Sequence, residues 1–136
     1  MWTYSQTSGR LYRDGILRAQ GYAGAGAYKN RPEAQGLKNK GPLPAGLYYI
    51  GEPVNIGDPS LWKDAHRHMG PFALALKPSP GNEMFGRDLF YVHGDSTPPG
   101  QASEGCMIFA RPIRNEIYES GDRILEVVTD FTEKEG

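Results

Sequence analysis

The sequence predicts one mainly β domain, a sandwich or barrel with one or two short helices. Its 136 residues are the length of a single domain, so we expect residues 1–136 to form one unit. Its 18 glycines and 11 prolines are spread along the chain. They separate short segments in which apolar and polar residues alternate, which is the pattern of β-strands.

The first three segments predict an antiparallel meander. Residues 2–5 and 9–13 alternate as strands, and a third strand is expected at residues 16–22. Between the second and third lies Asp14-Gly15, a dipeptide that favours a type I′ hairpin turn.

Loops and helices are predicted from glycine and proline positions. Residues 23–46 are rich in Gly, Asn, Pro and Lys and predict an ordered loop. Residues 59–69 favour a short helix with Pro59 at its first position. Residues 112–120 favour a second helix that is closed by Gly121. The remaining strands are expected at residues 47–50, 72–77, 89–92 and 123–131.

Charge and hydropathy exclude two classes of partner. The chain carries 15 basic and 16 acidic residues and no long basic run, so a surface that tracks nucleic-acid phosphates is not expected. Apolar stretches such as residues 72–76 are far shorter than the ~18 residues of a membrane-spanning helix. Residues 1–6 lack the basic start and apolar core of a signal peptide. We therefore expect synthesis in the cytoplasm, no membrane insertion, and any export by another route.

Cys106 is the single cysteine of the chain. It excludes an intramolecular disulfide and a structural zinc site of several thiolates. His66 and His68 form a His-x-His pattern, but no nearby third ligand is evident. The sequence therefore predicts neither a metal nor a cofactor.

His93 and Cys106 are the residues whose setting suggests chemistry. A thiol is a weak nucleophile until it becomes a thiolate, so a catalytic cysteine needs a base or a cation nearby. His93 follows an apolar strand and opens a loop, and Cys106 comes 13 residues later, directly after Gly105. A glycine there permits a tight turn that could aim backbone N–H groups at an oxyanion. Residue type and spacing alone leave open that the two residues are ordinary ends of neighbouring strands.

Several separated motifs resemble the L,D-transpeptidase (YkuD-like) fold. The run Ser103-Glu104-Gly105-Cys106, preceded by His93-Gly94, resembles its active-site signature, and residues 41–48 resemble its Pro-x-Gly-x-Tyr/Phe segment. The resemblance is greatest to the L,D-transpeptidase-like effectors of type VI secretion. It extends over residues 1–6, 9–12, 21–24, 29–30, 70–72, 93–96 and 102–106.

This resemblance implies a role for each residue of the motif. Cys106 would be the nucleophile and His93 its base, with the Gly94 carbonyl orienting the imidazole ring. Gly105 and Cys106 would supply the oxyanion site, and Ser103 would support the turn. If His93 activates Cys106, we expect a lowered thiol pKa.

Asp95 and Tyr48 each allow two interpretations. Asp95 either tunes His93 as part of the catalytic group or forms a turn in the loop. Tyr48 belongs to the core or to the wall of the cleft, where it would contact substrate.

The chain departs from the broader family near the nucleophile. Glu104 stands where the family has a second histidine, so it is a candidate for substrate binding. Ile108 stands where an Arg or Asn would bind a substrate carboxylate, and Arg111 or Arg87 could replace that donor. The spacing between His93 and the cysteine is also shorter than usual.

The function implied is that of an antibacterial effector acting on peptidoglycan. The enzyme would be an L,D-carboxypeptidase or L,D-transpeptidase that acts on tetrapeptide stems in the periplasm of a target cell, without a cofactor. An immunity protein and a component of the secretion apparatus would be its partners. The alternative is a non-catalytic carbohydrate- or peptide-binding β-domain of a phage or secretion apparatus. A papain-like or NlpC-type peptidase is disfavoured, because there the cysteine precedes the histidine.

Overall fold

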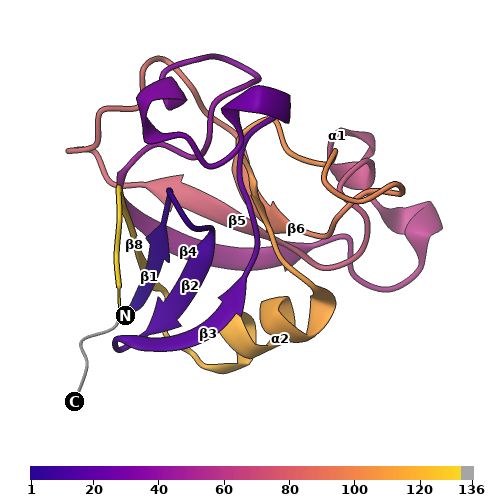
Figure 1. Ribbon diagram of the computed structural model, residues 1–136. Helices are drawn as coiled ribbons and strands as arrows, with labels where there is room; N and C mark the ends of the chain where they lie inside the picture. The colour runs from indigo at the N-terminus through magenta and orange to yellow at the C-terminus, as the bar shows by residue number, and fades with distance from the viewer. Residues whose placement is uncertain (133–136) are drawn as a thin grey trace.

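The computed structural model describes residues 1–132, and these residues form one eight-stranded sheet with the order β3-β2-β1-β8-β4-β5-β6-β7 (Figure 1). The strands are β1 (Trp2–Ser5), β2 (Arg10–Arg13), β3 (Ile16–Gln20), β4 (Gly46–Val54), β5 (Ala73–Pro78), β6 (Phe90–His93), β7 (Met107–Ile108) and β8 (Ile124–Val128). The β1–β8 and β6–β7 pairs are parallel, and the other neighbours are antiparallel. The predicted mainly β fold is confirmed.

The sheet curls until its two edges meet. β3 and β7 stand at opposite ends of the strand order, but Tyr22 lies just past β3 and pairs with Ile108 of β7. Two backbone hydrogen bonds, of 3.3 and 2.8 Å, join these residues. A Cβ atom on Gly21 would lie 1.9 Å from the Ile108 carbonyl oxygen, so only glycine permits this approach. The closure gives the sheet its barrel-like form.

The N-terminal meander matches the sequence prediction. β1, β2 and β3 pair antiparallel in order. In the turn between β2 and β3, Asp14 has φ 49° and Gly15 has φ 82°. Positive φ at both central residues is the requirement of a type I′ turn.

The helices are short and peripheral to the sheet. They are α1 (Asp64–Arg67), α2 (Arg111–Glu119) and three 3₁₀ turns, η1 (Gly26–Tyr28), η2 (Pro32–Ala34) and η3 (Pro59–Leu61). α2 confirms the helix predicted at residues 112–120 to within one residue at each end. The helix predicted at residues 59–69 is divided into η3 and α1, because Trp62 and Lys63 between them are extended. Within residues 1–132, none of the helices combines the length and the apolar character needed to cross a bilayer.

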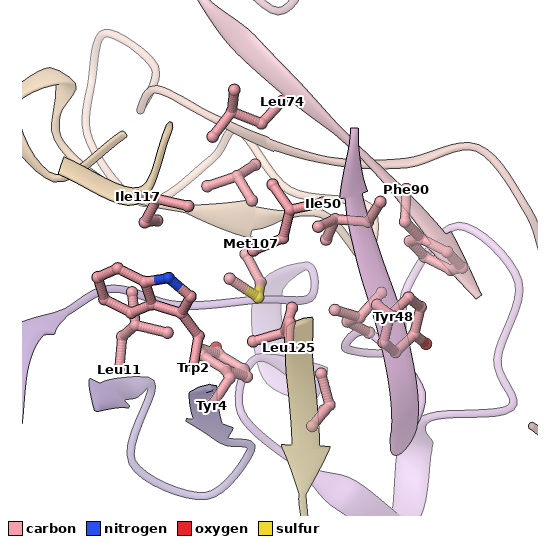
Figure 2. Close-up of a cluster of buried hydrophobic side chains, with 14 of the residues drawn as sticks. Trp2, Tyr4, Leu11, Tyr48, Ile50, Leu74, Phe90, Met107, Ile117 and Leu125 are labelled. Atoms are coloured by element: carbon pink, nitrogen blue, oxygen red, sulfur yellow. The ribbon is translucent and has the colours of Figure 1, made fainter. Parts of the chain in front are cut away.

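Buried apolar side chains from every strand except β3, and from α2, fill the core. Figure 2 shows part of this cluster: Trp2, Tyr4, Leu11, Tyr48, Ile50, Leu74, Phe90, Met107, Ile117 and Leu125. Phe90 and Val92 anchor β6 in this core. Because side chains alternate across a strand, Tyr91 and His93 emerge on the opposite face of β6.

Candidate active site

A cavity of about 590 Å³ contains both Cys106 and His93 in its lining. Its walls come from residues 38–39, from residues 65–69 at α1, from residues 87–93 and from residues 101–106. Figure 1 shows why these segments meet: α1 lies beside the loop that follows β6. The fold thereby places Cys106 and His93, the two residues predicted to be catalytic, in one cavity.

The parallel pairing of β6 with β7 positions Cys106. Met107 lies opposite Val92 in this pair, so the preceding Cys106 is placed next to Tyr91. The Tyr91 N–H donates a hydrogen bond of 3.4 Å to the Cys106 Sγ atom. The N–H of Cys106 itself also favours the charged sulfur. The N–H groups of Tyr91 and Cys106 therefore both act to lower the thiol pKa.

The turn before the nucleophile requires glycine at position 105. Gly105 has φ 141°, which side chains rarely adopt. A Cβ atom there would lie 2.6 Å from Arg87 Nη2 and 2.7 Å from Phe90 Cε1. Backbone conformation and lack of space therefore both exclude a side chain.

We expect Gly105→Ala to lower both stability and activity. Strain at a positive φ costs about 1–3 kcal/mol, and the contacts with Arg87 and Phe90 add to it. Displacing Cys106 by about 1 Å would reduce the rate roughly 100-fold. Gly121→Ala is the matched control, because Gly121 has φ 70° but a Cβ added there would have no atom within 4 Å. Thermal unfolding and the carboxypeptidase activity expected from the sequence, measured on both variants, check this, and equal losses in the two would contradict the role assigned to the crowded turn.

Ser103 holds this turn from inside the protein. Its hydroxyl donates to the Cys106 carbonyl at 2.7 Å and accepts the N–H groups of Gly105 at 3.0 Å and Gly24 at 2.9 Å. The predicted supporting role of Ser103 therefore has a geometric basis. Because the Gly105 N–H is already used here, it is not free to stabilise an oxyanion, which corrects the role expected for it from the sequence.

Arg87 is a buried guanidinium that positions the same turn. Its four terminal N–H groups donate to backbone carbonyls: those of Gln35, Gly41 (2.9 Å), Pro42 (2.9 Å) and Glu104 (3.1 Å). The guanidinium also lies over the Phe90 ring, with its carbon 5.1 Å from the ring centroid. These bonds tie residues 35–42 to the nucleophile turn and leave no terminal N–H for a substrate carboxylate.

His93 is held as a neutral base. Its Nδ1–H donates to the Gly94 carbonyl at 2.9 Å, which leaves the Nε2 lone pair to accept a proton. Burial lowers the His93 pKa below its ordinary value, and the hydrogen bond to Gly94 only partly opposes this effect. Behind the site, Arg114 of α2 packs so closely that a Cβ on Gly94 would lie 3.1 Å from Nη1.

The thiol of Cys106 is also neutral in this arrangement. Burial raises the pKa of Cys106 to about 11, and the Tyr91 hydrogen bond and the charge of Arg87 offset only part of that effect. This corrects the expectation of a lowered thiol pKa. Within residues 1–132 the sulfur is hydrogen-bonded to Tyr91 and not to His93. The hydrogen bond between Cys106 and His93 that activation requires is therefore not formed at rest, and catalytic hydrogen bonds often tighten only when substrate binds.

Asp95 organises the loop between the two catalytic candidates. Its carboxylate accepts hydrogen bonds from the Tyr22 hydroxyl at 2.6 Å and from the N–H groups of Ser96 at 2.8 Å and Gly100 at 2.9 Å. Burial opposes ionisation of Asp95, but these bonds outweigh it and lower the pKa. Its charge raises the His93 pKa by less than burial lowers it. Of the two interpretations of Asp95, the geometry favours the one in which it forms a turn in the loop.

The three residues predicted to bind substrate are not together. Glu104 lines the cavity beside Cys106. Arg111 does not, because at the start of α2 it bonds to Asn115 and stacks over Phe72. Tyr48 is 2% exposed, packs in the core and donates its hydroxyl to the Pro44 carbonyl. Neither Arg111 nor Tyr48 lies where a substrate in the cavity would reach it.

Tyr91 was not predicted from the sequence, and no role in the site was assigned to His66 and His68. Tyr91 could have been found, since it lies two residues before His93 and therefore on the same face of the strand. His66 and His68 line the cavity only because α1 lies against it. Within residues 1–132, no group of three or more His, Cys, Asp or Glu side chains is arranged to hold a metal ion.

Comparisons with known proteins concern both the family and the fold. The family model described as the Tlde1 domain matches residues 18–129. Two solved structures, of the helical cell shape determining protein Pgp2 from Campylobacter jejuni and of a point mutant of it, are 16% identical with a TM-score of 0.53. Each alignment covers 99% of this chain but 48% or 49% of the other, so the chain spans about half the length of those structures. At this identity the likeness is one of fold. No curated protein matches the sequence.

Proposed function

Because the chain belongs to the Tlde1 domain family of type VI effectors, which are L,D-transpeptidase-like, we propose that it is a cysteine-dependent L,D-carboxypeptidase and L,D-transpeptidase of peptidoglycan tetrapeptide stems. The family supports a peptidoglycan-related effector role and an enzyme that modifies peptidoglycan. One observation carries the finer proposal. Cys106, the single cysteine, shares a cavity with His93, whose bond to Gly94 leaves Nε2 to accept a proton.

Acylation begins with transfer of the Cys106 thiol proton to Nε2 of His93. The thiolate attacks the carbonyl carbon of the meso-diaminopimelate residue, whose next bond joins it to the terminal D-Ala. The Tyr91 N–H, which is directed toward the sulfur at rest, and the Cys106 N–H donate to the oxyanion that forms. His93 then protonates the D-Ala nitrogen and the C–N bond breaks. D-Ala departs, and the remaining stem stays bound to Cys106 as a thioester.

Deacylation returns the enzyme to its resting state. Water, or the amine of a free D-amino acid, attacks the thioester carbonyl and gives a proton to His93. The C–S bond breaks, and the proton passes to the Cys106 sulfur. Water yields a tripeptide stem, which is the carboxypeptidase outcome. A D-amino acid yields an exchanged tetrapeptide, which is the transpeptidase outcome.

Digestion of purified tetrapeptide stems, followed by mass spectrometry, tests this proposal. The wild-type protein should release D-Ala, and with an added D-amino acid such as D-Met it should also form the exchanged product. Intact-protein mass spectrometry should detect the acyl group on Cys106. An unchanged tetrapeptide in both reactions would contradict the proposed function.

The proposed substrate lies outside the cytoplasm, and this predicts how toxicity depends on location. Expression of the chain in a Gram-negative host should be harmless in the cytoplasm, whereas fusion to an export signal should cause rounding and lysis. Microscopy and viable counts measure the difference, and exported Cys106→Ala is the control that must be harmless. Equal toxicity in both compartments would exclude peptidoglycan as the target. As an effector, the protein would act in the periplasm of a target cell and be paired with an immunity protein and a component of the secretion apparatus.

A further inference from the structure

The proposed reaction requires a binding group for the carboxylate of the terminal D-Ala. This carboxylate belongs to the residue directly after the carbonyl that Cys106 attacks, and consecutive Cα atoms are about 3.8 Å apart. At the position of the family's usual donor the chain has Ile108, which is 3% exposed. Arg111 is outside the cavity, and the terminal N–H groups of Arg87 are taken by backbone carbonyls. The binding group must therefore come from another part of the cavity wall.

Tyr91 and His66 form a hydrogen-bonded pair in that wall. The Tyr91 hydroxyl and the His66 Nε2 atom are 3.2 Å apart, and the ring centroids are 5.6 Å apart. Both residues line the cavity with Cys106. The Tyr91 N–H contacts the sulfur, so the phenol reaches out from a backbone position adjacent to the nucleophile. The hydroxyl is therefore a polar group in the wall of the cavity that contains Cys106.

The pair is held in place from two sides. Tyr91 belongs to β6, between residues buried in the core. His66 is fixed by Asn55, whose buried side-chain amide donates to the carbonyls of His66 at 2.7 Å and Gly70 at 2.6 Å. Asn55 itself has φ 58°, a conformation that asparagine tolerates better than most residues. Rigid attachment of both partners favours binding, because little side-chain entropy is lost.

We propose that the Tyr91 hydroxyl, supported by His66, binds the C-terminal carboxylate of the tetrapeptide stem and so selects a free D-Ala end; this inference rests on the proposed function. In the tautomer that carries its proton on Nε2, His66 donates to the Tyr91 oxygen, and the Tyr91 O–H is then free to donate to the substrate. The negatively charged carboxylate receives this hydrogen bond from the phenol. A bond of this kind is stronger than a neutral one, and more so in a shielded site.

The experiment compares two substrates, the tetrapeptide with a free C-terminal carboxylate and the same peptide as the C-terminal carboxamide. Wild-type protein should prefer the free acid by about 10- to 100-fold in kcat/KM, as expected for the loss of a hydrogen bond to a charged group. Tyr91→Phe, which keeps the ring and the backbone N–H, should raise KM for the acid by about 10-fold, change kcat less, and reduce the preference to near unity. His66→Gln should give an intermediate preference, because the amide can still donate to the phenol but does not reproduce the imidazole ring.

Tyr49→Phe is the matched control, since Tyr49 is 50% exposed and does not line the cavity. Binding of both peptides to the Cys106→Ala protein, with and without Tyr91→Phe, provides a readout independent of turnover. Cleavage with an unchanged acid preference in Tyr91→Phe would overturn this inference and leave the proposed function standing. A preference lost instead in Lys38→Gln would assign the carboxylate to that exposed lysine at the rim. Absence of both cleavage and binding by any form would overturn the proposed function, and this inference with it.

Discussion

Cys106→Ala and Cys106→Ser should release no measurable D-Ala and should still fold. The chain has no other thiol to replace the nucleophile. Where a nucleophile acts together with its base, its removal costs on the order of 10⁴-fold or more in kcat. In the serine variant the hydroxyl keeps the approximate shape of the thiol but is a much weaker nucleophile than a thiolate, so its residual rate should stay close to that of the alanine variant.

Stability measurements separate chemistry from folding in these variants. Cys106 is partly exposed at the cavity, and its side chain receives a single long hydrogen bond from Tyr91. Truncation to alanine therefore enlarges an existing cavity rather than creating a new one in the core, and we expect a loss of about 1 kcal/mol or less. Thermal unfolding should give nearly the wild-type Tm. A folded alanine variant that releases D-Ala at the wild-type rate would contradict the mechanism.

The parts of the fold that the sequence predicted correctly depend on local signals. Asp14-Gly15 predicts the first hairpin because both residues must have positive φ, and few other dipeptides allow this. The strand ending at His93 was identified because apolar residues precede it. These features need only neighbours in the sequence, so a single chain is enough to find them.

The parts that were missed depend on contacts between distant segments. β7 is two residues long and exists because it pairs with β6 on one side and with Tyr22 on the other. No alternation can be seen in two residues. Likewise, β4 continues to Val54 beyond a register shift between Ile50 and Pro53. A proline at this point would argue against a continuing strand.

In the candidate site, too, some features follow from the local sequence and others depend on distant segments. Residue type and spacing made Cys106 and His93 candidates, and the resemblance supplied their roles and those of their neighbours on the motif. The burial of the thiol could not be predicted from the sequence, because it depends on the cavity walls that α1 and residues 87–90 contribute. That burial reversed the expected direction of the Cys106 pKa. Arg87 was considered as a substrate-binding residue, but its partners are the carbonyl of Glu104 and those of a loop 45 to 52 positions earlier in the chain.

His93→Ala should lower kcat for D-Ala release by about 10²- to 10⁴-fold, the usual contribution of a positioned acid–base group. In the proposed mechanism His93 removes the proton from Cys106 and protonates the leaving amine, so both proton transfers of acylation are slower without it. His68→Ala is the matched control. His68 lines the same cavity but has no place in the mechanism, so we expect its loss to be less than about 10-fold. Added imidazole, which can occupy the space left by the ring, should restore part of the rate of His93→Ala and none of the rate of Cys106→Ala.

The pH dependence gives an independent check on the same residue. A base must be neutral to accept a proton, and burial lowers the pKa of His93 below its ordinary value of 6.5. The acid limb of the wild-type kcat/KM profile should therefore fall below pH 6.5 and be absent from the residual activity of His93→Ala. Iodoacetamide labelling of resting Cys106 should instead rise toward pH 11, because burial raises the thiol pKa to about 11. A His93→Ala variant with wild-type kcat and an unchanged acid limb would remove His93 from the mechanism and make His66 or His68 the base.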